Sequence, residues 1–234
     1  MRVADIMNNN LKIVLVLVVV LLVAVLIWAN MAQHTDLGSN SYGYVTKDVY
    51  SHYKNPAARI AIVTGMHPRE DLATTMVPYA IKLFALFNRV EVADYHITVQ
   101  NQPENFDVGR RNGEDLAAQY AVPDIIKSNY QLAIISHDHE QGYGEGYYIA
   151  TPTRDDKSIS LAGSVHQLIP HFNFYPGSSE IRKQASSIIL VDKPLAKVGI
   201  PVFVYEMPEW HNALDAIYHT YQLIGASSRV LQSN

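Results

Sequence analysis

Residues 58–70, ARIAIVTGMHPRE, decide the fold. Arg59–Thr64 is a short, largely apolar run that predicts a buried strand, and Gly65 permits a tight bend directly after it. His67 and Glu70 follow three residues apart at the start of a helical pattern, so their side chains can converge from one turn. The segment therefore predicts a strand that ends in a pair of metal-type ligands.

The spacing of His67 and Glu70 is a weak signal by itself, because His137 and Glu140 repeat it. A helix-capping role would explain Glu70 without any metal, but it leaves His67 at the strand exit without a function. The position after a core strand is therefore what favours a site.

The rest of the chain switches between short β-branched runs and longer helical periods, which predicts an α/β sandwich with a mixed, largely parallel sheet. We expect polar side chains at the carboxyl ends of the strands to form the site. Pro78 and Pro123 predict kinks or breaks in their helices. The predicted strands are Arg59–Thr64, Tyr95–Gln100, Gln131–His137, Gly146–Ala150 and Pro201–Glu206, and the predicted helices are Glu70–Phe87, Glu114–Asn129, Ser158–Ile169, Ser178–Val191 and Glu209–Ile224.

A second strand end carries four consecutive polar groups with ligand chemistry. The apolar run before Ser136 is followed by His137, Asp138, His139 and Glu140. A solvated turn is the alternative for this cluster. We predict that His137 is the third ligand because it still lies on the strand, and we keep His139 in reserve.

A third strand end places Glu206 after the apolar run Val202–Tyr205. A carboxylate at a buried strand end is costly unless it is paired or used, and a general base for water is such a use. Asp192 and Glu209 have no comparable setting; Glu209 suits the first turn of the final helix, where negative charge is favourable.

Two adjacent arginines, Arg110 and Arg111, lie in a predicted glycine-flanked loop. Guanidinium groups bind carboxylates or stabilise a developing oxyanion. Two solvated arginines on a surface loop are the alternative.

The composition of the chain restricts which partners and which metal ligands it can have. The chain of 234 residues has a formal net charge of -4 and no basic surplus, which argues against nucleic acid as a partner. It has no cysteine, so a metal must be held by His, Asp or Glu. The length suits one globular domain beside the N-terminal extension.

The N-terminus is a continuous apolar segment. Residues 11–29 are long enough to cross the hydrocarbon of a bilayer as one helix. We therefore predict a cytoplasmic tail over 1–10, a single-pass transmembrane helix over 11–29, a tether over 30–41 and an extracytoplasmic domain over 42–234 at the cell membrane. A cleaved signal peptide is the alternative, although the apolar run is longer than is usual for one.

The four motifs, in this order, resemble the zinc metallocarboxypeptidase superfamily, which includes carboxypeptidase A-like enzymes and the succinylglutamate desuccinylase and aspartoacylase branch. GMHPRE matches its Gly-x-His-x-x-Glu motif, LAIISH the strand before the third histidine, and VFVYE the strand before the catalytic glutamate. The resemblance covers most of residues 59–224 and implies the three-layer fold of that superfamily.

The resemblance also implies roles. Zinc would be bound by His67, Glu70 and His137, and Glu206 would activate water. Of the two arginines, we favour Arg111 for the oxyanion and assign Arg110 with Asn112 to the substrate. Tyr143 and Tyr175 are the candidates for the family's mobile tyrosine.

One departure affects the predicted substrate. Relatives have Asp-Leu-Asn-Arg, whose Asn and Arg bind a substrate carboxylate, where this chain has Asp115, Leu116, Ala117 and Ala118. The predicted activity is therefore hydrolysis of an amide in a peptide or an acylated amine. The alternatives are a small-molecule deacylase and a non-catalytic, membrane-anchored binding protein with the same fold.

Overall fold

The computed structural model describes residues 3–177 and 185–233 and divides the chain into two compact units, Met1–Met31 and Ala32–Asn234. The first unit is helix α1 (Val3–Ala29). Within it, Asn10–Ala29 is long and apolar enough to cross a membrane. A helix of this kind is also found in signal sequences, so its length and composition leave both predicted alternatives open.

The second unit is built on one eight-stranded sheet in the order β1-β2-β4-β3-β5-β8-β6-β7. The four central strands β4, β3, β5 and β8 are mutually parallel, whereas β1, β2 and β6 pair antiparallel to their inner neighbours. The strands are β1 (Gln33–Asn40), β2 (Gly43–Tyr50), β3 (Arg59–Thr64), β4 (Glu91–Val99), β5 (Leu132–His139), β6 (Tyr148–Ala150), β7 (Asn173–Tyr175) and β8 (Val202–Pro208).

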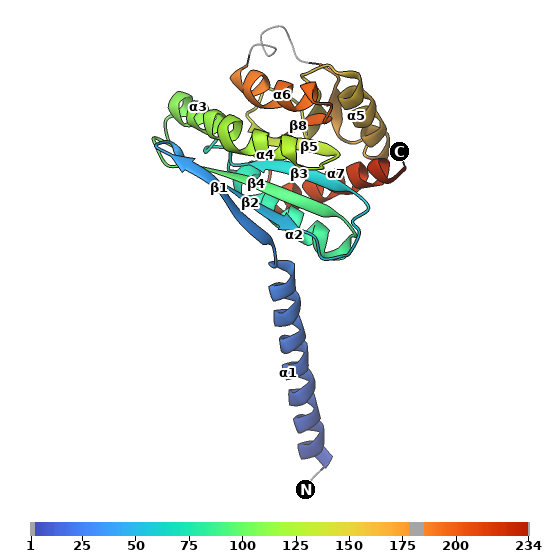
Figure 1. Ribbon diagram of the computed structural model, residues 1–234. Helices are drawn as coiled ribbons and strands as arrows, with labels where there is room; N and C mark the ends of the chain where they lie inside the picture. The colour runs from blue at the N-terminus through green and yellow to red at the C-terminus, as the bar shows by residue number, and fades with distance from the viewer. Residues whose placement is uncertain (1–2, 178–184, 234) are drawn as a thin grey trace. The chain divides into compact units, whose positions relative to one another are not determined.

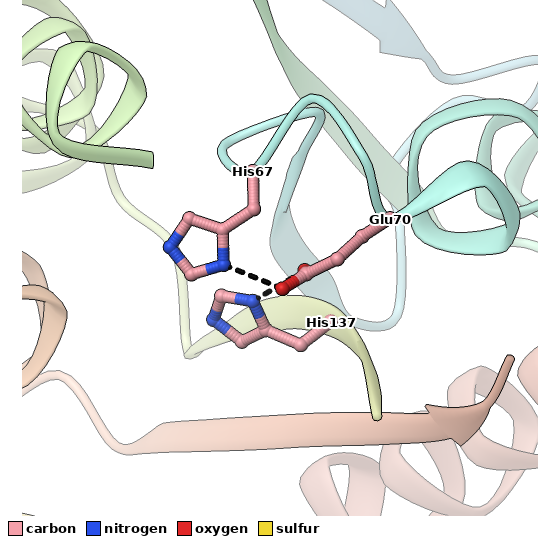
Figure 2. Close-up of side chains that lie close together, drawn as sticks. All are labelled: His67, Glu70 and His137. Atoms are coloured by element: carbon pink, nitrogen blue, oxygen red, sulfur yellow. Dashed lines mark hydrogen bonds and ion pairs between the residues drawn. The ribbon is translucent and has the colours of Figure 1, made fainter. Parts of the chain in front are cut away.

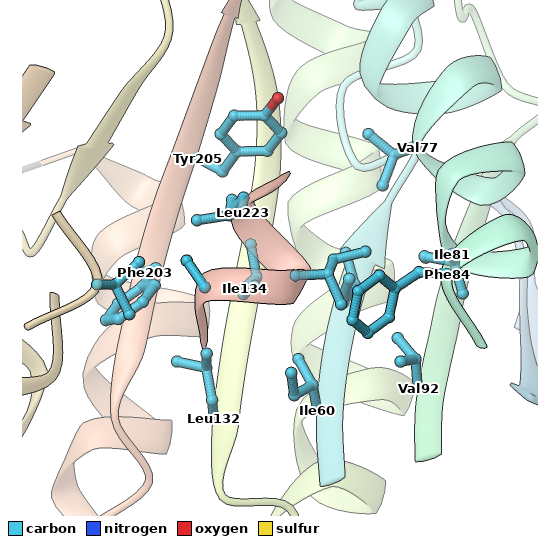
Figure 3. Close-up of a cluster of buried hydrophobic side chains, with 14 of the residues drawn as sticks. Ile60, Val77, Ile81, Phe84, Val92, Leu132, Ile134, Phe203, Tyr205 and Leu223 are labelled. Atoms are coloured by element: carbon cyan, nitrogen blue, oxygen red, sulfur yellow. The ribbon is translucent and has the colours of Figure 1, made fainter. Parts of the chain in front are cut away.

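Helices cover both faces of this sheet (Figure 1), which confirms the predicted α/β sandwich. One face packs against α2, α5 and α7, with Phe84 and Leu223 over strand residues such as Ile134 (Figure 3). The other face packs against α3, α4 and α6. The helices are η1 (Leu72–Met76), α2 (Val77–Phe87), α3 (Phe106–Leu116), η2 (Ala117–Ala121), α4 (Val122–Lys127), α5 (Asp156–Leu168), η4 (Ile188–Asp192), α6 (Lys193–Lys197) and α7 (Ala213–Ser233).

The predicted tether over 30–41 is wrong, because β1 occupies Gln33–Asn40 and pairs along β2. The segment QHTDLGSN has no apolar alternation, so the sequence gives no strand signal. An edge strand needs only backbone hydrogen bonds on one side. Leu37 and a hydrogen bond of 2.8 Å from the Tyr120 hydroxyl to the Ser39 carbonyl hold it in place.

The predicted breaks at Pro78 and Pro123 take the form of wide helical turns. Each proline lies at the start of an α-helix and follows a five-residue π-helical turn, η1 or η2, and Pro194 follows η4 in the same way. Proline has no amide hydrogen and crowds the preceding turn, and a wider turn relieves this conflict.

Two other helices differ in extent between the prediction and the structure. The final helix begins at Ala213, so Glu209 lies before it and not in its first turn. The first seven residues of the helix predicted over 178–191 lie outside the described residues, and its remainder is η4 with the turn before it. In α2, Leu83 and Phe87 are 41% and 65% exposed.

Candidate metal centre and active site

The loop after β3 brings His67 and Glu70 to the end of the sheet. Gly65 has a φ of 71°, and a Cβ on it would lie 2.3 Å from the Ile97 carbonyl oxygen, so the bend requires glycine. His67 is buried, and Glu70 comes just before η1.

His67, Glu70 and His137 meet at this point, as Figure 2 shows. The Nδ1 atoms of His67 and His137 lie 2.7 and 2.8 Å from the two oxygens of Glu70. The imidazole rings stack with centroids 4.4 Å apart. One ligand atom from each residue lies within 4.8 Å of the others, so the three predicted ligands form one cluster that could hold a metal ion.

The electrostatics of the cluster suit a cation. Burial raises the pKa of Glu70, but the adjacent His67 and His137 lower it by more, so the pKa lies well below its ordinary value. Burial lowers the pKa of His67, and the carboxylates of Glu70 and Glu114 reverse this, so that it is raised. Carboxylate charge is therefore concentrated around the histidine nitrogens.

Glu114 is a site residue that the sequence did not single out. It is 1% exposed, and its Oε1 lies 3.2 Å from His67 Nε2. A carboxylate at this nitrogen fixes the ring orientation and favours a proton on Nε2, which leaves Nδ1 free to bind a metal. The donor set and this second interaction therefore fit a metal ion.

Gly113 positions Glu114. A Cβ on Gly113 would lie 1.8 Å from the Met66 carbonyl oxygen, so α3 can approach the loop after β3 only with glycine at this position. This close contact brings Glu114 next to His67. The sequence shows the glycine, but only the packing shows its purpose.

Asp138 is another buried carboxylate that the sequence left without a role. Its oxygens accept hydrogen bonds of 2.7 and 2.9 Å from the amides of Leu72 and Ala73. Its own amide donates to Glu70 Oε2 at 3.3 Å. Burial and the nearby Glu70 raise the pKa of Asp138 to about 7, while the two amides lower it. Asp138 thus ties the helix start and Glu70 to β5.

Glu206 lies beside the cluster because β5 and β8 pair in register. His137 on β5 is the direct partner of Glu206 on β8, and Glu206 is in turn the partner of Tyr148 on β6. Glu206 is 7% exposed, and its Oε2 has no hydrogen-bond partner among the residues that the structure describes. Burial raises its pKa to about 8, despite the opposing effect of His137.

The two arginines lie on helix α3 and not on a loop, so they point in different directions. Arg110 Nε lies 3.4 Å from Glu114 Oε1, and its Nη1 lies 3.9 Å from Glu70 Oε1. Arg111 is exposed and does not line the cavity beside the cluster. Asn112 is buried and donates to the Asn101 carbonyl at 2.9 Å. The structure therefore brings Arg110 to the cluster and leaves Arg111 and Asn112 away from it.

His139, the reserve ligand, is turned away from the metal cluster. Its Nε2 lies 2.9 Å from the Gly146 carbonyl, and its Nδ1 lies 3.2 Å from the Glu140 carbonyl. Both nitrogens thus hold the loop after β5. Alternation puts His137 and His139 on the same face of β5, so it is the position of His139 further along the strand and these two contacts that separate it from the cluster.

A cavity of about 380 Å³ adjoins the cluster. Tyr143 and Tyr175 both line it, whereas Ala117 is fully buried in the core under α3 and α4. Other lining residues among those described are Arg69, Glu70, Arg110, His137, Tyr148, Ile188, Asp192, Glu206 and Glu209.

No family model and no curated protein sequence matches the chain. Several solved structures are similar to it in fold. A metallo-carboxypeptidase from Burkholderia cenocepacia superposes with a TM-score of 0.63 at 14% identity, covering 90% of this chain and 67% of that one. The LapA aminopeptidase from Legionella pneumophila gives a TM-score of 0.57 at 10% identity, covering 90% and 61%.

Thrombin activatable fibrinolysis inhibitor matches with a TM-score of 0.51 at 13% identity, covering 88% of this chain and 71% of that one. This chain thus spans roughly two thirds of the length of these three structures. Identities this low establish a common fold. The chain therefore has a metallo-carboxypeptidase-like fold, as its strand-end motifs predicted.

Proposed function

We propose that the protein is a zinc-dependent hydrolase that cleaves an amide bond in a peptide or acylated amine. The observation that carries the proposal is the meeting of His67, Glu70 and His137 beside a buried carboxylate, Glu206. Two histidines and one carboxylate, with no cysteine in the chain, form a donor set that catalytic zinc sites use.

The proposed roles follow from position. Zinc, when bound, supplies a Lewis acid that polarises a carbonyl and lowers the pKa of water. Glu206 accepts the proton of the attacking water and passes it to the leaving amine, a task that suits a carboxyl with a pKa of about 8. Arg110, rather than the Arg111 that we favoured from sequence, faces the developing oxyanion.

The test uses the full chain in detergent. We expect one zinc per chain, and hydrolysis of at least one member of a library of carboxy-terminal and internally quenched peptides. Glu206→Gln should keep the metal and lower turnover by roughly 10²–10⁴-fold, since it removes the proton acceptor. His67→Ala should lose the metal, while Glu104→Gln, an exposed control, should change neither. A chain without metal, or with turnover unaffected by Glu206→Gln, contradicts the proposal.

A non-catalytic binding protein with the same fold is the second candidate. Ala117 in the core and Ala118 beside it cannot bind a substrate carboxylate as the Asn and Arg of the resembling enzymes do. In a pure binder, Glu206→Gln would change ligand affinity but there would be no turnover to lose. The wild-type peptide assay therefore separates the two candidates.

We also propose that α1 anchors the chain as a single-pass membrane protein with the second unit, Ala32–Asn234, outside the cytoplasm. The support is the apolar segment Asn10–Ala29, with Lys12 near its start and Trp28 near its end. An anchored chain stays with the membrane after alkaline carbonate extraction and keeps its N-terminal residues. A soluble chain whose N-terminus begins after Trp28 would instead identify a cleaved signal.

A further inference from the structure

Helix α2 presents only apolar and aromatic side chains to the solvent. Its exposed residues are Tyr79, Leu83 and Phe87, which are 57%, 41% and 65% exposed. Their spacing of four residues places them in one row along the helix, which we call the α2 row. Helix α5 follows the usual pattern of a surface helix, since four of its five exposed residues are polar or charged. The α2 row is therefore apolar where a surface helix normally carries polar groups.

Packing within the protein does not explain the α2 row. Val77, Ile81 and Phe84 lie on the other side of the helix and are buried in the hydrophobic cluster beneath it. Single exposed apolar residues are common on protein surfaces, but three in one row form a continuous strip. Such a strip marks a surface that is covered by a partner.

The composition around the α2 row suits the surface of a lipid bilayer. The chain has no acidic residue from Leu72 to Asn88. Lys82 lies in α2 with its Nζ 5.7 Å from the centre of the Tyr79 ring, and exposed Arg89 follows the helix. Helices that lie on membranes combine Leu and aromatic residues with Lys or Arg, because the apolar groups enter the acyl region while the cations meet phosphate groups.

The course of the chain brings the same side of the second unit within reach of a membrane. The apolar segment ends at Ala29, and Ala32 follows three residues later, so their Cα atoms are at most about 11 Å apart. Ala32 packs against the same hydrophobic cluster as α2. The register of β1 and β2, continued by one residue, places Ala32 opposite Tyr50, and the Lys82 ammonium lies 6.0 Å from the Tyr50 ring. The proposed anchor thus keeps the α2 side of this unit close to the bilayer.

We propose that the second unit docks on the bilayer surface through the α2 row, with Lys82 and Arg89 at the level of the phosphate groups. This inference goes beyond the proposed hydrolase activity and rests only on the proposed anchor. Docking would also hold the candidate active site at a constant height above the membrane. The reason is that α2 directly continues η1, which begins two residues after Glu70.

Spin labelling of the full chain in vesicles of phosphatidylcholine and phosphatidylglycerol tests the contact. The chain has no cysteine, so one introduced cysteine carries one label. Leu83→Cys places the label in the α2 row, and Lys127→Cys is the matched control, exposed on α4 over the opposite face of the sheet. The ratio of oxygen to nickel-chelate collision rates should be at least about fivefold higher at position 83, because oxygen concentrates in lipid and the chelate in water.

A second labelled variant identifies the cause. With the label at Tyr79→Cys, the double substitution Leu83→Glu and Phe87→Glu should return the collision ratio to that of the control, because carboxylates do not enter the acyl region. A ratio at position 83 equal to that of the control overturns the inference. Dipolar broadening between labels at position 83, at a low ratio of protein to lipid, also overturns it, since a second copy of the chain would then cover the α2 row.

Flotation of the vesicles on a density gradient tests the anchor separately. A chain that does not float with the vesicles contradicts the anchor and the docking together. A chain that floats with its label at position 83 in water contradicts the docking alone. Neither result depends on hydrolysis, so an inactive chain can pass these measurements and an active hydrolase can fail them.

Discussion

At the scale of single residues, Glu114 contacts one of the three proposed metal ligands, His67. The distance is 3.2 Å, and Glu114 belongs to a helix 47 residues further along the chain. Residues that orient a ligand in this way tune metal affinity without touching the metal. Glu114 is accordingly a positioning residue.

We expect Glu114→Ala to weaken zinc binding by roughly 10–100-fold, because His67 loses the partner that fixes its orientation. Competition with a chromophoric chelator measures the affinity. Asp115→Asn is the control. Asp115 is next to Glu114 in the chain, but its carboxylate has no contact with His67 among the described residues, so this substitution should leave the affinity unchanged. Unchanged affinity in Glu114→Ala would show that the contact does not support the site.

The buried acids also predict how stability depends on pH. Burial raises the pKa of Asp138 and Asp192 to about 7 and that of Glu206 to about 8, whereas these groups titrate near 4 in an unfolded chain. Between about pH 5 and 8 the folded chain therefore holds protons that the unfolded chain has released. Its free energy of unfolding should fall as pH rises, by up to about 1.4 kcal/mol per pH unit for each group.

Urea unfolding of the zinc-free chain at pH 5.5 and pH 8 measures this effect. The raised pKa of His67 acts in the same direction, since its stabilisation is lost as pH rises through it. Asp192→Asn should flatten the dependence by removing one of the groups. Stability that increases from pH 5.5 to pH 8 would contradict the burial of these carboxyl groups.

At the scale of elements, the π-helical turns lie where helices meet the site. The turn η1 begins two residues after Glu70, and η4 ends at Asp192. Each is followed by an α-helix with proline in its first turn. A π-turn carries one residue more per hydrogen-bonded ring than an α-turn, which re-aims the side chains around it. These turns thus help to direct two carboxylates toward the cavity.

Two glycines test whether the contact between α3 and the loop after β3 matters. We expect Gly113→Ala to lower the free energy of unfolding by about 1–3 kcal/mol, because the new Cβ would lie 1.8 Å from the Met66 carbonyl oxygen. Zinc affinity should fall as well, since α3 carries Glu114. Thermal unfolding and chelator competition report the two effects.

Gly163→Ala is the matched control. Gly163 lies inside helix α5, and the nearest atom to an added Cβ is 4.0 Å away on Phe174. This substitution should be neutral or stabilise the protein by up to about 1 kcal/mol through helix propensity. Equal stabilities for the two variants would show that the close approach at Gly113 is not required.

At the scale of the whole molecule, β1 completes the sheet ahead of residue 42. It pairs with β2 from Gln33 to Asn40, and Asn40 also donates to Gln119 at 2.8 Å. A fragment that begins at residue 42 would expose the whole edge of β2. Unpaired edges of this kind favour association between chains.

We therefore expect fragment 42–234 to melt at least about 5 °C below fragment 32–234 and to associate at high concentration, because it lacks the pairing of β1. Differential scanning calorimetry and sedimentation velocity measure the two properties. Equal melting temperatures and two monomeric fragments would mean that β1 contributes nothing to the sheet.

The sequence alone determined the central architecture. The apolar runs of β3, β5 and β8 are local patterns, and a buried strand can be predicted from a few consecutive residues. Their polar ends at His67, His137 and Glu206 could be predicted to meet, because parallel strands end at one edge of the sheet. The metal-ligand cluster and the fold follow from those three strands.

Only the tertiary structure decided which residues complete the site. The helical phase of α3 separates Arg110 from Arg111, and its close packing at Gly113 places Glu114 under His67. Asp192 had no local pattern to distinguish it, and only the folding of η4 places it on the wall of the cavity. These contacts join residues far apart in the chain, so they depend on packing that no local pattern encodes.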